Sequence, residues 1–417
     1  MTKNRSAARP EARRTAYLRS PRALAAAVRH KARVIAWRRR RSETPAARLL
    51  FAEDWYATRY GVGRAQAYRH YMRVGWQALH APAPWLDPSW YSATYQLPPN
   101  VSPLEHFASE PGRHRPNRWF DPAIWARVRG HHDIVRFLST LPVRADAPEI
   151  VLAGDGQHVL ADGVDLCVYA HYDPDGLVDP YVTTVVEALA GAGLTVVVCS
   201  ACDTLEPTGL RTLLPHAAHV LTIGNMGYDW GSYREGVRFA SARCAPRSVT
   251  FVNDSVYPVG DVGALVRELR GVDADLVGAT SSLELRPHLQ SFALHIRSTE
   301  VCRELLRELT ETFIHIPHRD YVVAAYEVGL SRRAEELGLR LGAVFDAPEL
   351  VGTTGAPLHP ASDRWQELLR AGFPFLKVSV VRERGAELVA LPSLTDRQSL
   401  ERVRRHAERL GVAVPWP

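Results

Sequence analysis

The sequence contains few cysteines and no long apolar run, and each scarcity excludes a class of protein. Its 417 residues include five cysteines, without the regular spacing of the disulfide framework of a small secreted domain. Cys199 and Cys202 form one Cys-x-x-Cys motif, but the second pair of a structural zinc site is missing. No stretch reaches the roughly 20 apolar residues of a membrane-spanning helix, and no secretory signal is visible. We therefore expect a protein of the reducing cytoplasm.

Acidic residues are almost absent from the amino-terminal stretch, which sets it apart from the rest of the chain. The formal net charge is +6, but residues 1–42 alone hold 14 of the 51 basic residues and one of the 45 acidic residues. The remainder is mildly acidic, with 37 basic against 44 acidic residues. Residues 1–43 are therefore predicted to form a basic, partly disordered arm. Such an arm fits attachment to an anionic membrane surface or simple solvation, and no specific nucleic acid partner is expected.

Tryptophan recurs at a fixed interval in the next part of the chain. Trp55, Trp90 and Trp125 are 35 residues apart, and each stands in a similar frame of apolar and acidic residues. A fixed period in this range predicts stacked helical units that bury a face only against each other. Residues 44–148 are therefore predicted to form a small all-helical repeat module. Packing within the module explains the aromatic side chains best, and sugar binding is the alternative.

Residues 149–378 alternate between short apolar segments and amphipathic helices, which is typical of an open α/β sheet. A strand at 166–169, a helix at about 177–192 and a strand at 195–199 form a β-α-β unit, so the two strands are predicted to be parallel. Ligands of such sheets bind beyond the carboxyl ends of the strands. Further strands are predicted at 220–223, 249–252, 291–296 and 339–345, and residues 379–417 are predicted to be a C-terminal helical extension around a charged helix at 394–410.

Polar residues and one glycine follow three of the predicted strands. They are His171 and Asp173 after the first strand, Asn225, Gly227 and Asp229 after the strand at 220–223, and Asn253, Asp254 and Ser255 after the strand at 249–252. Because the carboxyl ends of parallel strands lie at one edge of a sheet, we expect these residues to meet in one site. Turn formation and helix capping explain the same residue types without a ligand. Beyond the second loop, Ser232 and Glu235 form a capping box, which predicts a helix that begins at Ser232.

Five segments of the α/β region resemble the rhamnan synthesis protein F family. They occur in the same order and with similar spacing between Leu166 and Lys377, at residues 225–233, 252–257, 288–292, 326–330 and 360–377. The tryptophan frames are similar to the DPxWY repeats found beside bacterial polysaccharide glycosyltransferase domains. The family contains glycosyltransferase-like proteins of bacterial cell-wall and surface polysaccharide assembly. The resemblance implies a glycosyltransferase A-type fold, the Rossmann-like fold of nucleotide-diphospho-sugar transferases.

The resemblance also implies a reaction. This is the transfer of rhamnose or another deoxyhexose from a nucleotide-diphosphate sugar, dTDP-rhamnose above all, to a glycan or polyprenyl-linked glycan. Departure of the diphosphate needs charge neutralisation, commonly by a divalent cation, Mg²⁺ or Mn²⁺, held on carboxylates. A-type enzymes hold it with an Asp-x-Asp motif, whereas the matching strand end here reads Asn253-Asp254-Ser255, with one carboxylate. Asp254 is the candidate metal or diphosphate ligand, and His171, Asp173, Asn225, Gly227, Asp229, Asn253 and Ser255 are the candidates for donor binding.

An inverting transferase needs a carboxylate base that takes the proton of the attacking acceptor hydroxyl. Many A-type enzymes carry this base just before a helix whose pattern residues 327–338 match in part, which makes Glu327 the candidate base. Asp320 is its rival. His288 and Gln290 precede the predicted strand at 291–296 and are candidates for binding the acceptor sugar, or they cap that strand.

Two other functions fit the same residues. A non-catalytic glycan-binding or scaffold subunit of a polysaccharide assembly complex would keep the fold without the second metal carboxylate. A transferase for a non-sugar group such as a phospho-alditol would share the nucleotide site. In each case the expected location is cytoplasmic, either free or peripheral on the inner face of the plasma membrane.

Overall fold

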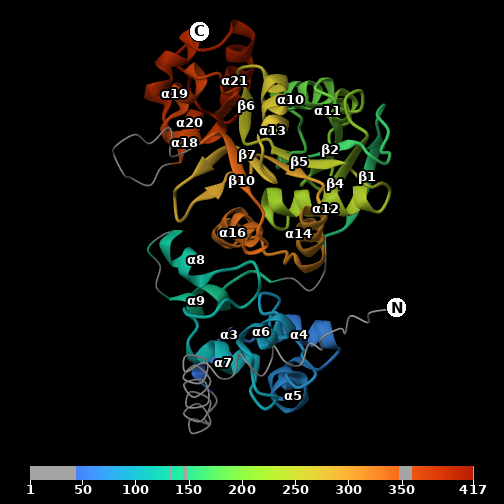
Figure 1. The fold of residues 1–417 in the computed structure, drawn as a ribbon, viewed down its shortest axis with the longest axis vertical. Coiled ribbons are helices and arrows are strands. Elements are labelled where there is room, and N and C mark those ends of the chain that lie inside the picture. The colour runs from blue at the N-terminus through green and yellow to red at the C-terminus, as the bar shows by residue number, and fades with distance from the viewer. Residues whose placement is uncertain (1–43, 129, 131–132, 144–147, 347–358, 417) are drawn as a thin grey trace, which may run out of the picture.

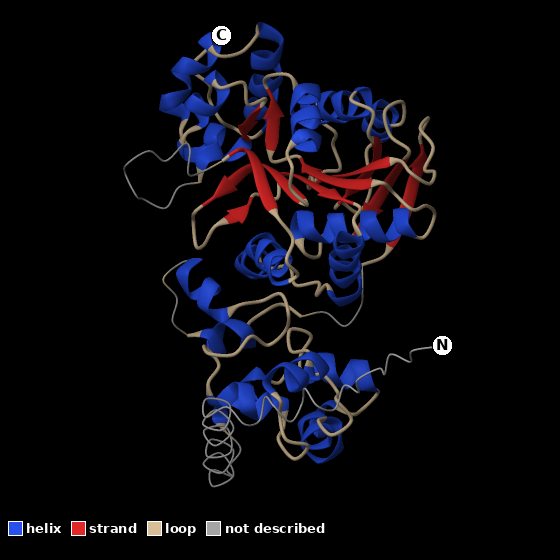
Figure 2. Ribbon diagram, viewed as in Figure 1, coloured by secondary structure: helices blue, strands red, loops and turns tan. Residues whose placement is uncertain are grey.

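The computed structural model describes residues 44–128, 130, 133–143, 148–346 and 359–416. The predicted basic arm, residues 1–43, lies outside the described residues. The described chain forms two lobes, an all-helical lobe up to residue 143 and an α/β body from residue 148 (Figures 1 and 2). None of the helices in these ranges combines the length and the apolarity needed to cross a bilayer.

The helical lobe consists of short helices, and α3, α6, α7, α8 and α9 begin at a proline or a capping side chain. Asp87, for example, accepts a hydrogen bond from the backbone N–H of Trp90 at 3.0 Å, and Pro88 takes the first position of the helix that follows. The elements are α3 (Pro45–Leu50), α4 (Glu53–Tyr60), η1 (Arg64–Gln66), α5 (Ala67–His70), η2 (Tyr71–Gly75), α6 (Pro88–Tyr95), α7 (Pro103–Ser109), α8 (Pro122–Val128) and α9 (Ile134–Ser139). The three tryptophans of the 35-residue period lie on α4, α6 and α8.

Two units of this lobe, which we call the first unit (residues 51–81) and the second unit (residues 86–115), repeat one buried contact. The hydroxyl of Tyr56 lies 2.9 Å from Nδ1 of His70 in the first unit, and the hydroxyl of Tyr91 lies 2.9 Å from Nδ1 of His106 in the second. Both tyrosines are fully buried. Because a buried hydroxyl needs a partner, each unit supplies its own tyrosine with a histidine.

The following residues, 120–141, pack against the α/β body instead. Trp125 of α8 stacks on Phe137 of α9 with ring centroids 4.4 Å apart. Phe120 stacks on Tyr321 of the body, with centroids 4.8 Å apart and planes nearly parallel. The contact between Phe120 and Tyr321 joins the helical lobe to α15, which leads through η3 to Glu327.

A nine-stranded sheet forms the centre of the body. Its strands run in the order β1-β4-β3-β2-β5-β9-β7-β10, and β8 pairs with the end of β7. The pairs among β2, β3, β4 and β5 are parallel, as is β7 with β10, whereas β1 and β9 run antiparallel to their neighbours. The strands are β1 (Ile150–Asp155), β2 (Asp165–His171), β3 (Thr195–Ser200), β4 (His219–Ile223), β5 (Ser248–Asn253), β7 (Leu276–Ser282), β8 (His288–Leu289), β9 (Ala293–Arg297) and β10 (Leu341–Phe345). A separate antiparallel pair joins β6 (Val256–Pro258) to β11 (Phe375–Lys377).

Helices cover both faces of the sheet, because central strands such as β2 bury their side chains on both sides. Leu166, Val168 and Ala170 of β2 share a core with α12, α14 and α16, while Cys167 and Tyr169 share the opposite core with α10 and α13 (Figure 1). The helices are α10 (Pro180–Gly191), α11 (Pro207–Leu213), α12 (Tyr228–Ser241), α13 (Val262–Gly271), α14 (Glu300–Thr312), α15 (Arg319–Val322), η3 (Val323–Glu327) and α16 (Val328–Glu336). The C-terminal elements are α18 (Pro360–Asp363), α19 (Trp365–Arg370), α20 (Val378–Glu383), η5 (Gly385–Ser393) and α21 (Arg397–Arg409).

The body confirms most of the predicted elements and corrects one. The strands predicted at 166–169, 195–199, 220–223 and 249–252 lie within β2 to β5, those at 291–296 and 339–345 overlap β9 and β10, and the predicted helices at 177–192 and 394–410 contain α10 and α21. The helix start predicted at Ser232 is wrong, because α12 begins at Tyr228 and follows Gly227. Glu235 therefore does not cap the helix. Its buried carboxylate instead accepts a hydrogen bond from Nε of Arg238 at 2.9 Å.

Candidate functional site

The turn between β4 and α12 positions Asp229. Gly227 and Tyr228 both have positive φ angles, +107° and +53°, a region that suits glycine and is costly for tyrosine. A Cβ atom on Gly227 would lie 3.0 Å from the ring of Phe313, so the turn also needs the small residue for space. The result is that Asp229 lies in the first turn of α12, where the helix dipole favours a negative charge.

Asn253, at the end of β5, connects this turn to the neighbouring strand. Its Nδ2 donates a hydrogen bond to Oδ2 of Asp229 at 2.5 Å. Its Oδ1 accepts hydrogen bonds from the backbone N–H of Ser255 at 3.1 Å and from the hydroxyl of Ser255 at 2.5 Å. The structure thus brings three of the predicted donor-site residues together and fixes the orientation of the amide between them.

Asp254 lies at the same edge of the sheet. Its Oδ2 accepts a hydrogen bond from the backbone N–H of Tyr172 at 2.6 Å, and its own N–H donates to the carbonyl of Ala170 at 3.1 Å. Burial raises the pKa of Asp254 to about 7, with further increases from the charges of Asp229 and Asp173, against the lowering effect of the Tyr172 N–H. Asp254 as a residue is partly buried.

Lys377, at the end of β11, brings a positive charge to these carboxylates. Burial lowers the pKa of Lys377, and the negative charges of Glu327 and Asp229 oppose that change. Burial likewise raises the pKa of Asp229, with Glu327 adding to the rise and Lys377 opposing it. These mutual effects define a charge cluster of Asp229, Glu327 and Lys377. The sequence analysis did not identify Lys377, although its place as the last residue of the family-like segment 360–377 was a signal.

Glu327 is the last residue of η3 and directly precedes α16. Its Oε1 lies 3.4 Å from the backbone nitrogen of Ser291, which is long for a hydrogen bond. The carboxylate is therefore directed toward the segment between β8 and β9 without being tightly held there. Asp320, the rival base, lies in the first turn of α15 beside Arg319, whose charge also contributes to the lowered pKa of Lys377.

Gln290 and His288 are held by partners within the protein. Gln290 is fully buried, its Oε1 accepts the hydroxyl of Thr280 at 2.6 Å, and its Nε2 lies 2.6 Å from Nε2 of His359. Burial, together with the charge of Lys377, lowers the pKa of His359 to about 3, so this imidazole is neutral and accepts the amide proton. Nδ1 of His288 lies 2.8 Å from the carbonyl oxygen of Arg286. An acceptor-binding role for His288 and Gln290 stays a prediction.

His171 and Asp173 are also engaged. Nδ1 of His171 lies 2.7 Å from the hydroxyl of Ser200, and burial lowers the pKa of this histidine to about 4. Oδ1 of Asp173 accepts two backbone N–H groups of its own loop, and Oδ2 pairs with Arg409 of α21 at 2.7 Å. The C-terminal extension thus holds the first loop in place beside Asp254. Asn225 is exposed, two residues before Gly227.

The donor atoms at this edge suit a divalent cation only in part. Across the described residues, no group of three His, Cys, Asp or Glu side chains is arranged to hold a metal ion. Oδ2 of Asp254 and Oδ2 of Asp229 already accept hydrogen bonds, which leaves one further oxygen on each carboxylate. A cation here would take its other ligands from phosphate oxygens and water, as Mg²⁺ commonly does.

Comparison with known proteins shows no matching family model. One curated relative, the uncharacterized protein y4gN of Sinorhizobium fredii (strain NBRC 101917 / NGR234), is 27% identical over 192 residues, which are 44% of this chain and 49% of that protein. The chain therefore matches about half the length of this relative. The similarity identifies neither a family nor an activity.

Two solved structures match part of this chain with low scores. The glycosyltransferase GlyE in Streptococcus pneumoniae TIGR4 is 13% identical, with a TM-score of 0.30 over 61% of this chain and 65% of that chain. TarS of S. aureus is 12% identical, with a TM-score of 0.25 over 59% of this chain and 43% of that chain. Scores this low carry no conclusion about fold or function, so the assignment below rests on the site itself.

Proposed function

We propose that this chain is a glycosyltransferase of cell-surface polysaccharide assembly. It transfers a deoxyhexose, rhamnose in the first instance, from a nucleotide-diphosphate sugar such as dTDP-rhamnose to a glycan or polyprenyl-linked glycan. One observation carries the proposal: Asp229, Asn253 and Asp254 lie together after β4 and β5, and the charges of Glu327 and Lys377 act on Asp229. Ligands of open α/β sheets bind at this edge.

Glu327 is the proposed base. As the acceptor hydroxyl attacks the anomeric carbon of the donor, the new C–O bond forms, the bond from that carbon to the diphosphate breaks, and the hydroxyl proton moves to Glu327. Attack from the face opposite the diphosphate inverts the configuration. The long contact to Ser291 leaves the carboxylate free to accept this proton.

Lys377 and Asp254 are the proposed diphosphate residues. The departing nucleoside diphosphate gains negative charge, and a half-buried ammonium stabilises such charge more strongly than an exposed one because water screens it less. Asp254 is the residue that would hold a divalent cation, which would supply the same neutralisation. Asp229, oriented by Asn253, would accept hydrogen bonds from donor hydroxyls.

A thermal-shift titration tests the donor site. Full-length protein is titrated with dTDP, UDP and GDP, each with and without Mn²⁺, because a ligand that binds only the folded state raises its melting temperature. At a concentration of about 100 Kd the gain is roughly 2.7 kcal/mol, and we expect it for one nucleotide only. Lys377→Met and Asp254→Ala should abolish the shift, whereas Glu187→Ala, on the exposed face of α10, should retain it. No shift with any nucleotide would refute the donor site.

A non-catalytic glycan-binding or scaffold subunit is the second candidate. The single carboxylate in Asn253-Asp254-Ser255 favours it, since both Asn253 and Asp254 already have hydrogen-bond partners within the protein. Release of free sugar from a nucleotide-sugar donor separates the two proposals, because only the transferase hydrolyses the donor slowly in the absence of acceptor. Peripheral attachment through residues 1–43 is proposed for either function and predicts sedimentation with anionic vesicles that a chain beginning at residue 44 lacks.

A further inference from the structure

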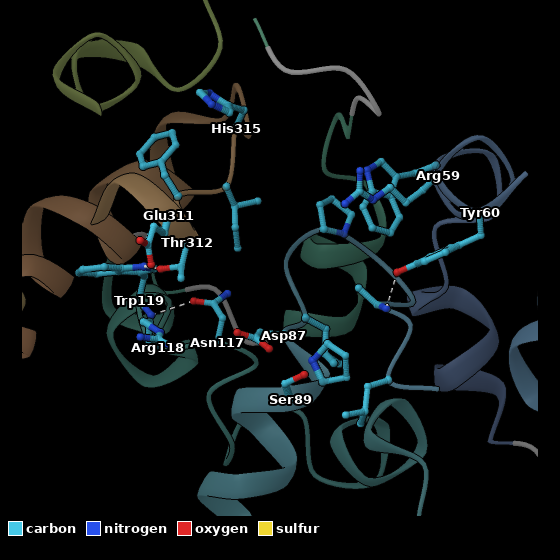
Figure 3. Close-up of a pocket in the computed structure, with 18 residues that line it drawn as sticks. Arg59, Tyr60, Asp87, Ser89, Asn117, Arg118, Trp119, Glu311, Thr312 and His315 are labelled. Atoms are coloured by element: carbon cyan, nitrogen blue, oxygen red, sulfur yellow. Dashed lines mark hydrogen bonds between the residues drawn. The ribbon is translucent and has the colours of Figure 1, made fainter. Parts of the chain in front are cut away.

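A cavity of about 500 Å³ lies between the helical lobe and the α/β body. Figure 3 shows Arg59 and Tyr60 of α4 on one side and Trp119 and Glu311 on the other. Its volume falls within the range of about 300–1,000 Å³ that is usual for small-molecule sites. Trp55, Asp87, Ser89, Arg118, Phe313 and His315 complete the part of the lining used below.

The two units differ in the side chain that lies over the tryptophan ring. In the second unit the hydroxyl of Tyr95 accepts the backbone N–H of Arg115 at 2.8 Å, and the Arg115 guanidinium lies over the ring of Trp90 at 5.5 Å. In the first unit the hydroxyl of Tyr60 accepts the backbone N–H of Ala81, also at 2.8 Å. Ala81 therefore occupies the position of Arg115. Its methyl group cannot reach across the ring of Trp55, and both residues line the cavity.

The polar groups around the cavity are balanced in charge. The lining contains two arginines, Arg59 and Arg118, and two acidic residues, Asp87 and Glu311. Arg118 also pairs with Glu308, which is not part of the lining, at 3.0 Å. Within the described residues, the side chains of Arg59 and Glu311 form no hydrogen bond or ion pair, and both residues are exposed, as is Ser89. A phosphate or other anion would call for an excess of positive charge. A lining of balanced charge with unengaged planar groups suits a neutral ligand that carries many hydroxyls.

The aromatic rings narrow the ligand class further. Trp55 is partly exposed, and Tyr60 and Trp119 line the cavity beside it. A sugar ring presents an apolar face of C–H bonds that packs on such rings, while its hydroxyls bond planar carboxylate and guanidinium groups. The hydroxyl of Tyr60 accepts the backbone N–H of Ala81 at 2.8 Å, which holds this ring in place. Trp119 is fully buried, and its Nε1 donates to the hydroxyl of Thr312 at 2.8 Å. Trp55 and Tyr60 are therefore the rings of this group that keep exposed surface for a sugar.

One wall of the cavity is shared with the candidate site. The wall is the segment Glu311–His315, whose Phe313 ring stacks on Tyr326 at 4.2 Å and lies against Gly227. Nδ1 of His315 lies 2.9 Å from the carbonyl oxygen of Met226. Because a carbonyl oxygen only accepts hydrogen bonds, this nitrogen carries a proton and donates it. The segment therefore contacts the turn that carries Asp229 and the residue that precedes Glu327.

We propose that this cavity binds a neutral oligosaccharide, the already formed part of the acceptor glycan. The assignment of the occupant as acceptor rests on the proposed transferase function, whereas binding of the neutral oligosaccharide does not. The helical lobe is then the part of the protein that holds the growing chain, and the α/β body is the part that extends it.

The test uses the difference between the two units. Fluorescently labelled full-length protein is applied to an array of short neutral oligosaccharides of the rhamnose, glucose and galactose series, together with uronic acid and sulfated counterparts, and the strongest neutral hit is then measured by calorimetry. Ala81→Arg gives the first unit the residue that covers the tryptophan in the second, and Arg59→Ala removes one polar partner. We expect Ala81→Arg to weaken binding at least about tenfold, equivalent to about 1.4 kcal/mol. Arg73→Ala, an exposed arginine of the same unit outside the cavity lining, should bind as the unaltered protein does.

Three results would overturn the proposal: no neutral oligosaccharide retained above background, hits retained equally by Ala81→Arg, or a preference for the anionic members. The nucleotide titration is run on the same variants and is expected to be unchanged by Ala81→Arg. Glycan binding without any nucleotide shift would support the oligosaccharide site and refute the proposed transferase. A nucleotide shift without glycan binding would support the donor site and refute the oligosaccharide site.

Discussion

Replacing Glu235 by glutamine tests how the first turns of α12 are held. The Glu235 carboxylate is 1% exposed, pairs with Arg234 and with Arg238 at 2.9 Å, and lies 3.3 Å from Nε2 of His315, which pairs with it when the imidazole is protonated. Although burial alone would raise the pKa of Glu235, the bonds to His315 and the two arginines lower it from 4.5 to about 2. A change of this size corresponds to about 3 kcal/mol of stabilisation of the charged form in the folded protein.

The pH dependence of the effect has a definite sign. Because the pKa of Glu235 is lower in the folded state than in the unfolded state, its contribution is complete above about pH 5 and is lost as the pH falls toward 2. We expect Glu235→Gln to lower the free energy of unfolding by about 2–3 kcal/mol at pH 7. The difference from the unaltered protein should shrink progressively below pH 4.5.

Urea unfolding followed by tryptophan fluorescence at several pH values between 3.5 and 7 measures the effect. Glu187→Gln, exposed on α10, is the matched control and should change the free energy of unfolding by less than about 0.5 kcal/mol. A difference between Glu235→Gln and the unaltered protein that stays constant down to pH 3.5, or a loss no larger than that of the control, would refute the reasoning. Glu235 would then stabilise the folded protein through packing and not through its charge.

Two further substitutions test the packing of the body. Gly236→Ala places a Cβ atom 2.3 Å from Cγ1 of Val168 and should cost about 1–3 kcal/mol, measured by urea unfolding. Gly191→Ala meets nothing within 4 Å and should be neutral or stabilising by up to about 1 kcal/mol, so equal midpoints for the two variants would contradict the packing argument. Arg409→Ala removes the pairing of α21 with two aspartates of the first loop and should speed proteolysis near the C-terminus, whereas Arg405→Ala, which pairs only within α21, should not.

The sequence predicted the centre of the sheet because burial itself leaves a pattern. β3 and β5 are runs of β-branched and apolar residues, and strands buried on both faces need such runs. The strand predicted at 291–296 overlaps β9, but its position in the sheet was not predicted. It lies antiparallel between β5 and β7, and this arrangement depends on pairings between residues distant in sequence that no local pattern records.

The candidate site was predicted in part for the same reason. Asp229, Asn253 and Asp254 follow strands that could be recognised, and the structure brings them together. Lys377 was missed because its strand, β11, belongs to a separate two-stranded pair and is only three residues long. The helix start at Tyr228 was missed because a tyrosine with positive φ has no signature in the sequence.

The shared wall Glu311–His315 also has a thermodynamic consequence. One segment contacts both the cavity and the Gly227 turn. Any coupling free energy between a ligand in the cavity and a nucleotide at the other site is therefore the same in both directions. If an oligosaccharide changes the affinity for nucleotide by some factor, the nucleotide changes the affinity for that oligosaccharide by the same factor. A single pair of titrations, each ligand in the presence of the other, would therefore measure the coupling free energy between the cavity and the nucleotide site.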